Sequence, residues 1–600
     1  MGNIPYQQRP AAIPSGENVK VVLIFPPPAD PALPYASLPY LAASLHQRGI
    51  KDVIQKDLNL ETFLNLLTQP QLRQAAQAAE KALTRGDLPP DRTDPVRRIL
   101  READCTIRDL PEALSILRDP VRFYELDSLL FAKEVFNNAC DLLSAPFRHF
   151  RFRKYSYSTH ELLSPSEILS AVDEEPQNPV VRFFQDNALP DLLALKPGLV
   201  AISVPYFQQL VPSLILTKLI KHRSPSTFVC LGGPIVSWGK QALLSESFRR
   251  FPLDGFFVGE ADTGLPELVE ALSGPGHLHQ VPNFVVLHDG KVRDYSNPPH
   301  SEDLDALPTP AYEGLPLADY LAPKRLISLS LSRGCYWNRC TFCNYSFIKL
   351  GPYRFRNPAA SARDVAAIVE KTGEDVFCFE SDVIQPEDLA AFSRELLAQN
   401  IRIKWHAVVR FEDSIDDEFC TLLAKAGCVR LYAGLESACQ RLLDLMDKGI
   451  TVPIIERILR SCSDAGIAVE AGVFFGFPSE TPAEADQTVE FFRKHRSRIT
   501  RSDAGTFRLL RGSPISAEPR EYGIVVTDVY EERWFELSYQ PLEDTGRDHA
   551  GRAVAQLETL YPAIKLIDIP EEILLLARLG KEALNDLVPQ RGPRNSVEPG

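Results

Sequence analysis

Three cysteines lie close together in the middle of this 600-residue chain, directly after a short apolar run at 326–331. Cys335, Cys340 and Cys343 are spaced C-x4-C-x2-C, and the apolar run before them predicts a strand that ends at their loop. Three thiolates on one loop can ligate three irons of a cubane cluster and leave the fourth iron open to a substrate or cosubstrate. The spacing therefore predicts an open [4Fe-4S] cluster.

Two other interpretations of these cysteines remain. A structural zinc ion takes four protein ligands at closed tetrahedral spacing, and no Cys or His nearby in the sequence supplies the fourth. Ordinary buried cysteines are the second alternative. The eleven cysteines of the chain are an odd number spread from Cys105 to Cys462, which favours reduced thiols over a disulfide framework.

The hydrophobic pattern indicates the elements that must position this loop. Six apolar, β-branched runs alternate with helical patterns such as those at 359–369 and 386–397. The six strands are expected at 326–331, 376–379, 401–409, 429–434, 469–475 and 505–510. Six strand and helix pairs predict an open partial (β/α)6 barrel of the TIM type over 326–510, with its chemistry at the carboxyl ends of the strands. A mostly helical extension is expected over 511–600.

A second alternating series precedes the barrel. Its strands are expected at 21–24, 53–57, 199–204, 228–231 and 255–258. This alternation predicts an α/β, Rossmann-like, doubly wound parallel sheet over 19–300, closed by a hairpin near 284–292. Apolar residues recur at helical spacing over about 60–195, which predicts a helical insertion. A flexible tail at 1–18 and a proline-bearing linker at 301–325 complete the expected order.

The bulk composition limits the classes of function. A net charge of −14 opposes a large nucleic-acid surface, because phosphate binding depends on clustered Lys and Arg. The sequence has no apolar run of eighteen residues, and its first residues lack a signal-peptide pattern. We therefore expect a cytoplasmic protein with neither a membrane span nor a nucleic-acid partner.

The segment from Ser330 to Cys343 resembles the cluster-binding loop of the radical S-adenosylmethionine (SAM) superfamily. The resemblance covers about 326–510, and it rests on the strand, the Arg-Gly-Cys loop and Phe342, the aromatic residue that lies beside the adenine in the family. It implies a [4Fe-4S] cluster on the three cysteines and SAM as cosubstrate. The family's usual spacing is C-x3-C-x2-C, so the additional residue between Cys335 and Cys340 leaves the subfamily open.

The same resemblance implies residues that bind SAM at the next two strand ends. Glu380 and Asp382 follow the second strand and would meet the SAM amino group, while Arg410 follows the third and would clamp the carboxylate. The alternative for the two acids is a solvated pair that caps the following helix. The alternative for Arg410 is a surface ion pair.

Two further strand ends complete the implied SAM site. Glu436 and Ser437 would reach the ribose or the methionyl end, and Gly476 lies in the segment under the adenine. Glycine allows a ligand to approach the backbone closely, although strand ends also carry glycine for turns alone. His406 is assigned no role.

The N-terminal series resembles the cobalamin-binding domain that precedes the barrel in one branch of the superfamily. The matching segments are 25–28, 41–45, 201–204, 231–234 and 258–260. The resemblance implies that Gly232 and Gly233 give backbone access to the nucleotide tail of the corrinoid. The alternative is a degenerate domain that binds no cofactor. The cobalt-ligating signature D-x-H-x-x-G does not follow the first strand, and His46 stands at the end of the first predicted helix, so no histidine is expected on cobalt.

The resemblance implies an enzyme that cleaves SAM to a 5′-deoxyadenosyl radical, abstracts hydrogen from an unactivated carbon and adds a methyl group from methylcobalamin. The implied substrate is a peptide or other natural product, and the implied electron donor is a flavodoxin or ferredoxin. One alternative keeps the radical chemistry without cobalamin and gives rearrangement, cyclisation or oxidation. Another is a non-catalytic iron–sulfur redox sensor.

Overall fold

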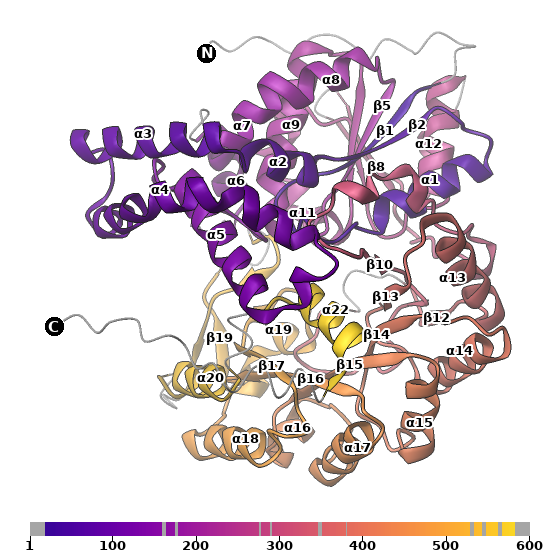
Figure 1. Cartoon of the computed structure of the whole chain (residues 1–600). Coiled ribbons are helices and arrows are strands. Elements are labelled where there is room, and N and C mark those ends of the chain that lie inside the picture. Colours follow the sequence, from indigo (N-terminus) through magenta and orange to yellow (C-terminus); the bar gives the residue numbers. More distant parts are fainter. Residues whose placement is uncertain are drawn as a thin grey trace. The chain divides into compact units, whose positions relative to one another are not determined.

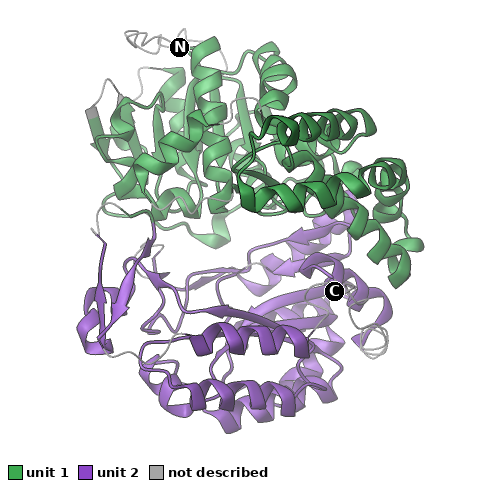
Figure 2. Ribbon diagram, turned by 90° about the vertical axis from the view of Figure 1, so that its left-hand side faces the viewer, with its two compact units in different colours: residues 1–323, 531–534 green, residues 324–530, 535–600 purple. Residues whose placement is uncertain are grey.

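The computed structural model divides the chain into two compact units. It describes residues 19–158, 164–174, 178–274, 278–288, 291–345, 351–379, 381–528, 533–542, 548–561 and 567–581. Unit 1 comprises Met1–Pro323 with Glu531–Trp534, and unit 2 comprises Lys324–Tyr530 with Phe535–Gly600 (Figure 2). The predicted tail at 1–18 lies outside the described residues.

Unit 1 is built on a seven-stranded sheet in the order β2-β1-β5-β6-β7-β8-β9. The strands are β1 (Val21–Phe25), β2 (Val53–Asp57), β5 (Leu199–Ser203), β6 (Phe228–Gly232), β7 (Gly255–Phe257), β8 (Phe284–His288) and β9 (Lys291–Asp294). The first five in the sheet order are parallel, and β8 and β9 continue it as an antiparallel hairpin. All of β1 is buried, as is usual for a parallel strand covered on both faces. The chain leaves β1 for β2 on one side and returns to β5 on the other, which confirms the doubly wound prediction.

Helices cover this sheet and fill the predicted insertion. Those beside the sheet are α1 (Ser37–Gln47), α9 (Leu210–Arg223), α10 (Pro234–Trp238), α11 (Lys240–Leu243) and α12 (Gly264–Ser273). The insertion contains α2 (Leu58–Leu66), α3 (Gln69–Arg85), α4 (Pro90–Arg118), α5 (Leu126–Ser144), α6 (Pro165–Asp173), α7 (Pro179–Phe183) and α8 (Leu189–Ala194). Figure 1 shows α3 and α4 extending away from the sheet. The insertion also contains a two-stranded hairpin, β3 (Phe150–Arg153) and β4 (Ser156–Ser158), which helical spacing did not predict.

Two segments distant in sequence are bound into unit 1. The hydroxyl of Tyr320, in the predicted linker, donates to Asp57 Oδ2 at 2.6 Å. Trp534 is fully buried, and its Nε1 donates to the carbonyl of Ile235 at 3.0 Å. A Cβ on Gly239 would lie 2.0 Å from the Trp534 ring, so this glycine is what lets the indole pack there.

Unit 2 is built on six parallel strands in chain order, β10-β13-β14-β15-β16-β17. The strands are β10 (Leu326–Ser328), β13 (Val376–Phe379), β14 (Lys404–Val409), β15 (Cys428–Glu436), β16 (Ala468–Phe475) and β17 (Arg501–Thr506). The connecting helices are α13 (Pro358–Thr372), α14 (Pro386–Ala398), α15 (Asp417–Lys425), α16 (Gln440–Leu445), α17 (Val452–Asp464) and α18 (Pro482–Lys494), and they lie on the outer side of the sheet (Figure 1). Strands that follow one another without closing form the open partial barrel that the sequence predicted.

The last barrel strand is displaced from its expected place. The sequence predicted a strand at 505–510, whereas β17 begins at Arg501 and a separate short strand, β18 (Leu509–Leu510), follows it. The displacement arises because β17 opens with Arg501 and Ser502, which are polar yet buried, so its start gives no apolar signal.

The described part of 511–581 combines helices with short strands. It contains α19 (Pro514–Ala517), β19 (Ile524–Val526), β20 (Glu536–Leu537), β21 (Tyr539–Pro541), α20 (Asp548–Leu560) and α22 (Ile569–Leu579). Helix α22 packs on β14 and β15. No helix within the described ranges is long and apolar enough to cross a membrane.

A buried ion network joins α22 to the amino-terminal halves of the barrel strands. Arg430 on β15 is fully buried and pairs with Glu470 on β16. Arg501 Nη1 lies 3.0 Å from Glu572 Oε2 on α22, and Arg501 Nε lies 3.4 Å from Glu470 Oε1. Because each carboxylate has a guanidinium partner, the network can stay charged away from water.

Candidate active site

The cysteine loop begins beyond β10 with a short strand, β11 (Ser332–Arg333), and all three thiols are half-buried. Burial raises the pKa of Cys340, and burial raises the pKa of Cys343 to about 11. Cys335 adds to both increases, so the three thiols are near enough to interact electrostatically. Within the described ranges, no group of three or more His, Cys, Asp or Glu side chains is already arranged to hold a metal ion. Three half-buried thiols on one loop nevertheless provide the donor set of a cluster with three protein ligands.

The loop is docked on the turn that follows α16. Trp337 Nε1 donates to the carbonyl of Asp447 at 2.7 Å, and Arg339 donates to both Asp447 carboxylate oxygens at 3.0 Å. Gly449 has a φ of +65°, and a Cβ there would lie 2.2 Å from the Trp337 ring. Two of the four residues between Cys335 and Cys340 are therefore held by one distant turn, while the Tyr336 hydroxyl donates to Glu412 Oε1 at 2.7 Å.

Arg410 lies beneath this loop at the end of β14. It is 6% exposed, so it is not a surface residue, and its guanidinium carbon lies 3.7 Å from the Trp337 ring centroid. The guanidinium pairs with Glu412 and donates to the carbonyl of Lys448. Its buried Nε has no hydrogen-bond partner among the described residues. A donor of this kind on a fixed guanidinium suits an anionic ligand.

Lys448 is a functional candidate that the sequence analysis missed. Its Nζ donates to Glu436 Oε1 at 2.6 Å and lies 6.0 Å from the centroid of the Phe342 ring. It also lowers the pKa of Cys340 and Cys343 against the effect of burial. Lys448 stands in the turn after α16, and no local spacing connects it with Glu436, so only the fold brings the pair together.

The remaining expected SAM contacts differ in their surroundings. Asp382 is exposed and lies near Tyr345 and the backbone of Gly334, at the start of the cysteine loop. The Ser437 hydroxyl accepts from Cys439 N at 3.1 Å and meets the Thr488 hydroxyl at 3.2 Å. These partners hold Ser437 against α18. Glu380 lies outside the described residues.

The expected adenine contacts lie on the same side of the barrel. The rings of Phe342 and Phe474 meet edge to face, with centroids 5.0 Å apart. Gly476 has a φ of +82°, and its N–H donates to the buried carboxylate of Glu480. Its positive φ favours glycine, so the turn by itself gives a reason for this residue.

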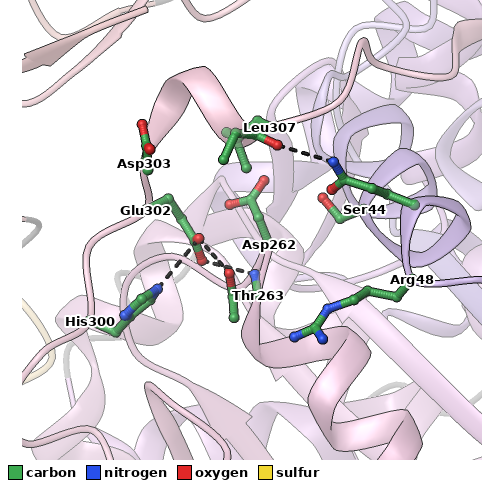
Figure 3. A pocket seen from close by; sticks show the side chains of 10 residues that line it. Ser44, Arg48, Asp262, Thr263, His300, Glu302, Asp303 and Leu307 are labelled. Carbon is green, nitrogen blue, oxygen red and sulfur yellow. Dashed lines mark hydrogen bonds and ion pairs between the residues drawn. The ribbon is translucent and has the colours of Figure 1, made fainter.

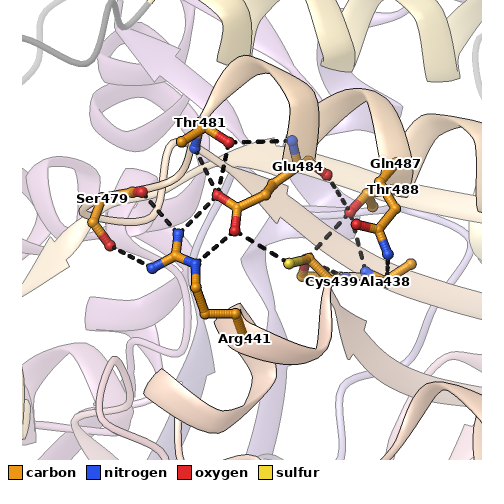
Figure 4. A network of polar contacts seen from close by, with 9 residues as sticks. Ala438, Cys439, Arg441, Ser479, Thr481, Glu484, Gln487 and Thr488 are labelled. Carbon is orange, nitrogen blue, oxygen red and sulfur yellow. Dashed lines mark hydrogen bonds and ion pairs between the residues drawn. The ribbon is translucent and has the colours of Figure 1, made fainter.

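A polar network connects the loop after β15 with the loop after β16 (Figure 4). Arg441 donates to both oxygens of Glu484 at 2.6 and 2.7 Å, and to the carbonyl of Ser479 at 2.9 Å. Its guanidinium lowers the pKa of Glu484 to about 2. The Thr481 side chain accepts from Glu484 N and so caps α18. This network fixes the two loops that carry Glu436 and Gly476.

A family comparison matches this region to a known superfamily. Residues 329–492 match the model of the radical SAM superfamily. This segment is a radical SAM domain. The domain contains the cysteine loop, Arg410, Glu436 and Lys448, and its cysteines remain the predicted cluster ligands.

The curated relatives of this chain include proteins named as a methyltransferase, a cyclase and a methylase. An uncharacterized methyltransferase of Pyrococcus horikoshii is 26% identical over 46% of this chain and 60% of its own length. The anaerobic magnesium-protoporphyrin IX monomethyl ester cyclase of Rubrivivax gelatinosus is 26% identical over 52% of this chain and 56% of its own length. The hopanoid C-3 methylase of Methylococcus capsulatus is 25% identical over 42% of this chain and 47% of its own length. The matched segment thus spans about half to three fifths of these relatives.

Two solved structures share the fold. The radical SAM methyltransferase TsrM from Kitasatospora setae, with cobalamin and a [4Fe-4S] cluster bound, matches 93% of this chain and 94% of its own at a TM-score of 0.54 and 16% identity. The cobalamin-dependent radical SAM enzyme OxsB, with aqua-cobalamin bound, matches 69% of this chain and 67% of its own at a TM-score of 0.53 and 17% identity. At these identities the likeness concerns the fold.

In unit 1 the expected cobalamin residues lie at the end of β6. Gly232 ends this strand, and Gly233 follows with a φ of +105°. A Cβ on Gly233 would lie 2.8 Å from the carbonyl oxygen of Val204, in the loop after β5. Glycine is therefore needed for the two loops to cross so closely.

Unit 1 also has a pocket of about 220 Å³ away from these glycines (Figure 3). It is lined by Ser44 and Arg48 near the end of α1, by Asp262 and Thr263, and by the segment that includes Glu302. Glu302 accepts from the Thr263 N–H at 2.9 Å and from its hydroxyl at 2.6 Å. The pocket therefore lies where the start of the linker is fixed to the sheet domain.

Proposed function

We propose that the chain is a radical SAM enzyme that methylates an unactivated carbon of a peptide or other natural product, with cobalamin as the methyl carrier. The single observation that carries the radical SAM part is the cysteine loop docked beside a buried Arg410 and a part-buried Lys448–Glu436 pair. Three cysteines supply cluster ligands, and the charged groups beside them suit a zwitterionic cosubstrate.

In this proposal Cys335, Cys340 and Cys343 hold a [4Fe-4S] cluster, which supplies the electron for reductive cleavage of SAM. The cations Arg410 and Lys448 bind the SAM carboxylate, because both lie in a buried site where charge-assisted hydrogen bonds are strong. Asp382 and Glu436 receive the amino group or the ribose hydroxyls. Glu380, Ser437, Gly476 and Phe342 remain proposed contacts on the strength of the resemblance.

The cobalamin part rests on unit 1. Its doubly wound sheet has a carboxyl edge at which Gly233 permits a close crossing of two loops. TsrM and OxsB, which share the fold, are described with cobalamin bound, and two relatives are named as methylating enzymes. The loop after β1 offers no histidine, so we propose that cobalt receives no nitrogen ligand from the protein. A flavodoxin or ferredoxin is the proposed electron donor.

Anaerobic reconstitution with iron and sulfide tests both parts. We expect absorbance of a [4Fe-4S] cluster, retention of hydroxocobalamin, and formation of 5′-deoxyadenosine from SAM under reduction. Bound cob(II)alamin should show unsplit cobalt lines in electron paramagnetic resonance, because a protein nitrogen ligand would split them into triplets. A chain that cleaves SAM but never retains corrinoid would instead belong to the cobalamin-independent alternative. A chain that holds a cluster but never cleaves SAM would be the redox sensor.

A further inference from the structure

The β3–β4 hairpin of the insertion lies against the carboxyl edge of the unit 1 sheet. Gln208, in the loop after β5, accepts from the N–H groups of Tyr157 and Ser158 at 3.2 and 3.4 Å. Lys154 Nζ, at the hairpin turn, lies 3.2 Å from the buried Asp30 Oδ2 in the loop after β1. The hairpin thus connects the loops after β1 and β5. These two strands are neighbours in the sheet, and the strand that follows each of them lies on the opposite side, β2 beside β1 and β6 beside β5. Doubly wound sheets bind their ligands at such a switch point.

Aromatic rings converge at this place from four segments of the chain. Phe25, the last residue of β1, stacks on Tyr35 with ring centroids 4.9 Å apart and an interplanar angle of 9°. Tyr35 meets Tyr206 of the β5 loop edge to face at 5.9 Å. Tyr206 meets Tyr155 of the hairpin turn edge to face at 4.9 Å. The switch point therefore carries a continuous aromatic cluster.

Tyr155 is an unusual residue for its backbone position. The turn between β3 and β4 has two residues, and Tyr155 adopts a φ of +56°, a conformation that usually takes glycine or asparagine. A bulky residue there costs about 1 to 3 kcal/mol, and such strain is concentrated at ligand-binding positions. Tyr155 is also 40% exposed, although it belongs to an aromatic cluster. The ring packs on Tyr206 on one side and keeps part of its surface open on another, in a backbone conformation that is costly for a bulky residue.

We propose that Tyr155 packs against the bound corrinoid and that the β3–β4 hairpin is a cofactor-binding element of unit 1. This inference rests on the proposed cobalamin function and deepens it. The ligand class follows from the chemistry of the edge, since an aromatic face suits the large, apolar face of a planar macrocycle. Lys154 and Gln208 fix the hairpin, and Tyr206 packs edge to face against the Tyr155 ring.

The test compares variants of the full chain for binding of hydroxocobalamin, by equilibrium dialysis with absorbance detection. Tyr155→Gly removes the ring and also relieves the strained φ, so it should weaken binding about tenfold without lowering the melting temperature. Tyr155→Phe keeps the ring and should bind within about twofold of the unaltered chain. Phe131→Ala, which removes a 37% exposed ring from helix α5, is the matched control and should leave binding unchanged.

The outcomes separate this inference from the function on which it rests. Weaker binding in Tyr155→Gly, with an undiminished melting temperature and recovery in Tyr155→Phe, supports the hairpin as a binding element. Equal binding by the unaltered chain and Tyr155→Gly overturns the inference and leaves the cobalamin function intact. An unaltered chain that binds no hydroxocobalamin overturns both.

Discussion

The carboxyl edges of the two sheets use different side chains. In unit 2 the edge carries buried charge, with Arg410 and Lys448 beside the cysteine loop. In unit 1 the edge carries aromatic rings, such as those of Tyr206 and Tyr155, and a glycine crossing at Gly233. The same architectural position therefore suits a small charged cosubstrate in one unit and a large macrocycle with apolar surface in the other.

Two buried acidic side chains, one in each unit, have different partners. Glu470 in unit 2 is paired with Arg430 and lies near Arg501, so its charge is compensated. Asp57 in unit 1 has the Tyr320 phenol as its buried partner, and burial raises the pKa of Asp57 to about 6. A hydroxyl stabilises a carboxylate less than a guanidinium does, so Asp57 can bind a proton under mild conditions.

The largest expected effect is the loss of the cluster. Replacing Cys335, Cys340 and Cys343 together by alanine should abolish cluster iron and 5′-deoxyadenosine formation, because no protein ligand would remain. Iron analysis and product chromatography measure this, with the exposed Cys105→Ala as control. Hydroxocobalamin binding in unit 1 should persist in the triple variant. Full iron content there would contradict the assignment.

The second effect concerns the ion network under the barrel. Glu470→Gln should destabilise the chain by about 3 to 5 kcal/mol, because it removes the charge paired with the fully buried Arg430. Urea unfolding followed by circular dichroism measures the change. Glu490→Gln removes one partner of an exposed pair with Arg493 and should change stability by less than about 0.5 kcal/mol. Equal losses in the two variants would show that the burial of the network has no energetic consequence.

The third effect tests the charged edge of unit 2. Lys448→Met should weaken SAM binding about 10- to 100-fold, the range for one charge-assisted hydrogen bond, and Arg410→Ala and Glu436→Ala should act in the same direction. Isothermal titration with SAM measures affinity, and the exposed Lys425→Met is the control. Lys448→Arg keeps the charge and should recover part of the affinity. Unchanged SAM affinity in all of the Arg410, Glu436 and Lys448 variants would remove the distinction between the two edges.

The smallest effect is a pH dependence from Asp57. Because its pKa rises from 3.8 to about 6 on folding, the native state binds the proton more tightly than the unfolded chain. Its contribution to stability is therefore full below about pH 4 and is lost as the pH rises through about 6. Asp57→Asn keeps a side-chain oxygen for the Leu60 N–H that caps α2, and it has no proton to lose.

Unfolding free energies of wild type and Asp57→Asn across this range provide the measurement. The variant should gain on the order of 2 kcal/mol relative to the wild type between pH 4 and pH 7. The other charged groups near Asp57 are Glu61, which raises its pKa, and Lys56, which lies 2.7 Å from Glu61. A difference that does not change with pH would show that Asp57 has an ordinary pKa.

Local patterns in the sequence predicted the parts of the fold that depend on near neighbours. The three cysteines share one loop because only eight positions separate the first from the last. The parallel strands were predictable because strands covered on both faces are continuous apolar runs, as in β1. Where a strand opens with buried polar residues, as β17 does at Arg501, the pattern failed by several positions.

The partners of the site residues were decided by the tertiary structure. Lys448 meets Glu436 because the turn after α16 returns to the end of β15, and Trp337 meets Arg410 because that same turn receives the cysteine loop. Ser437 follows Glu436 in sequence, yet its hydroxyl is bound by Cys439 and Thr488. Spacing determines which residues share a loop, whereas the packing of distant segments determines which side chains meet, and a single sequence carries no direct signal for the second.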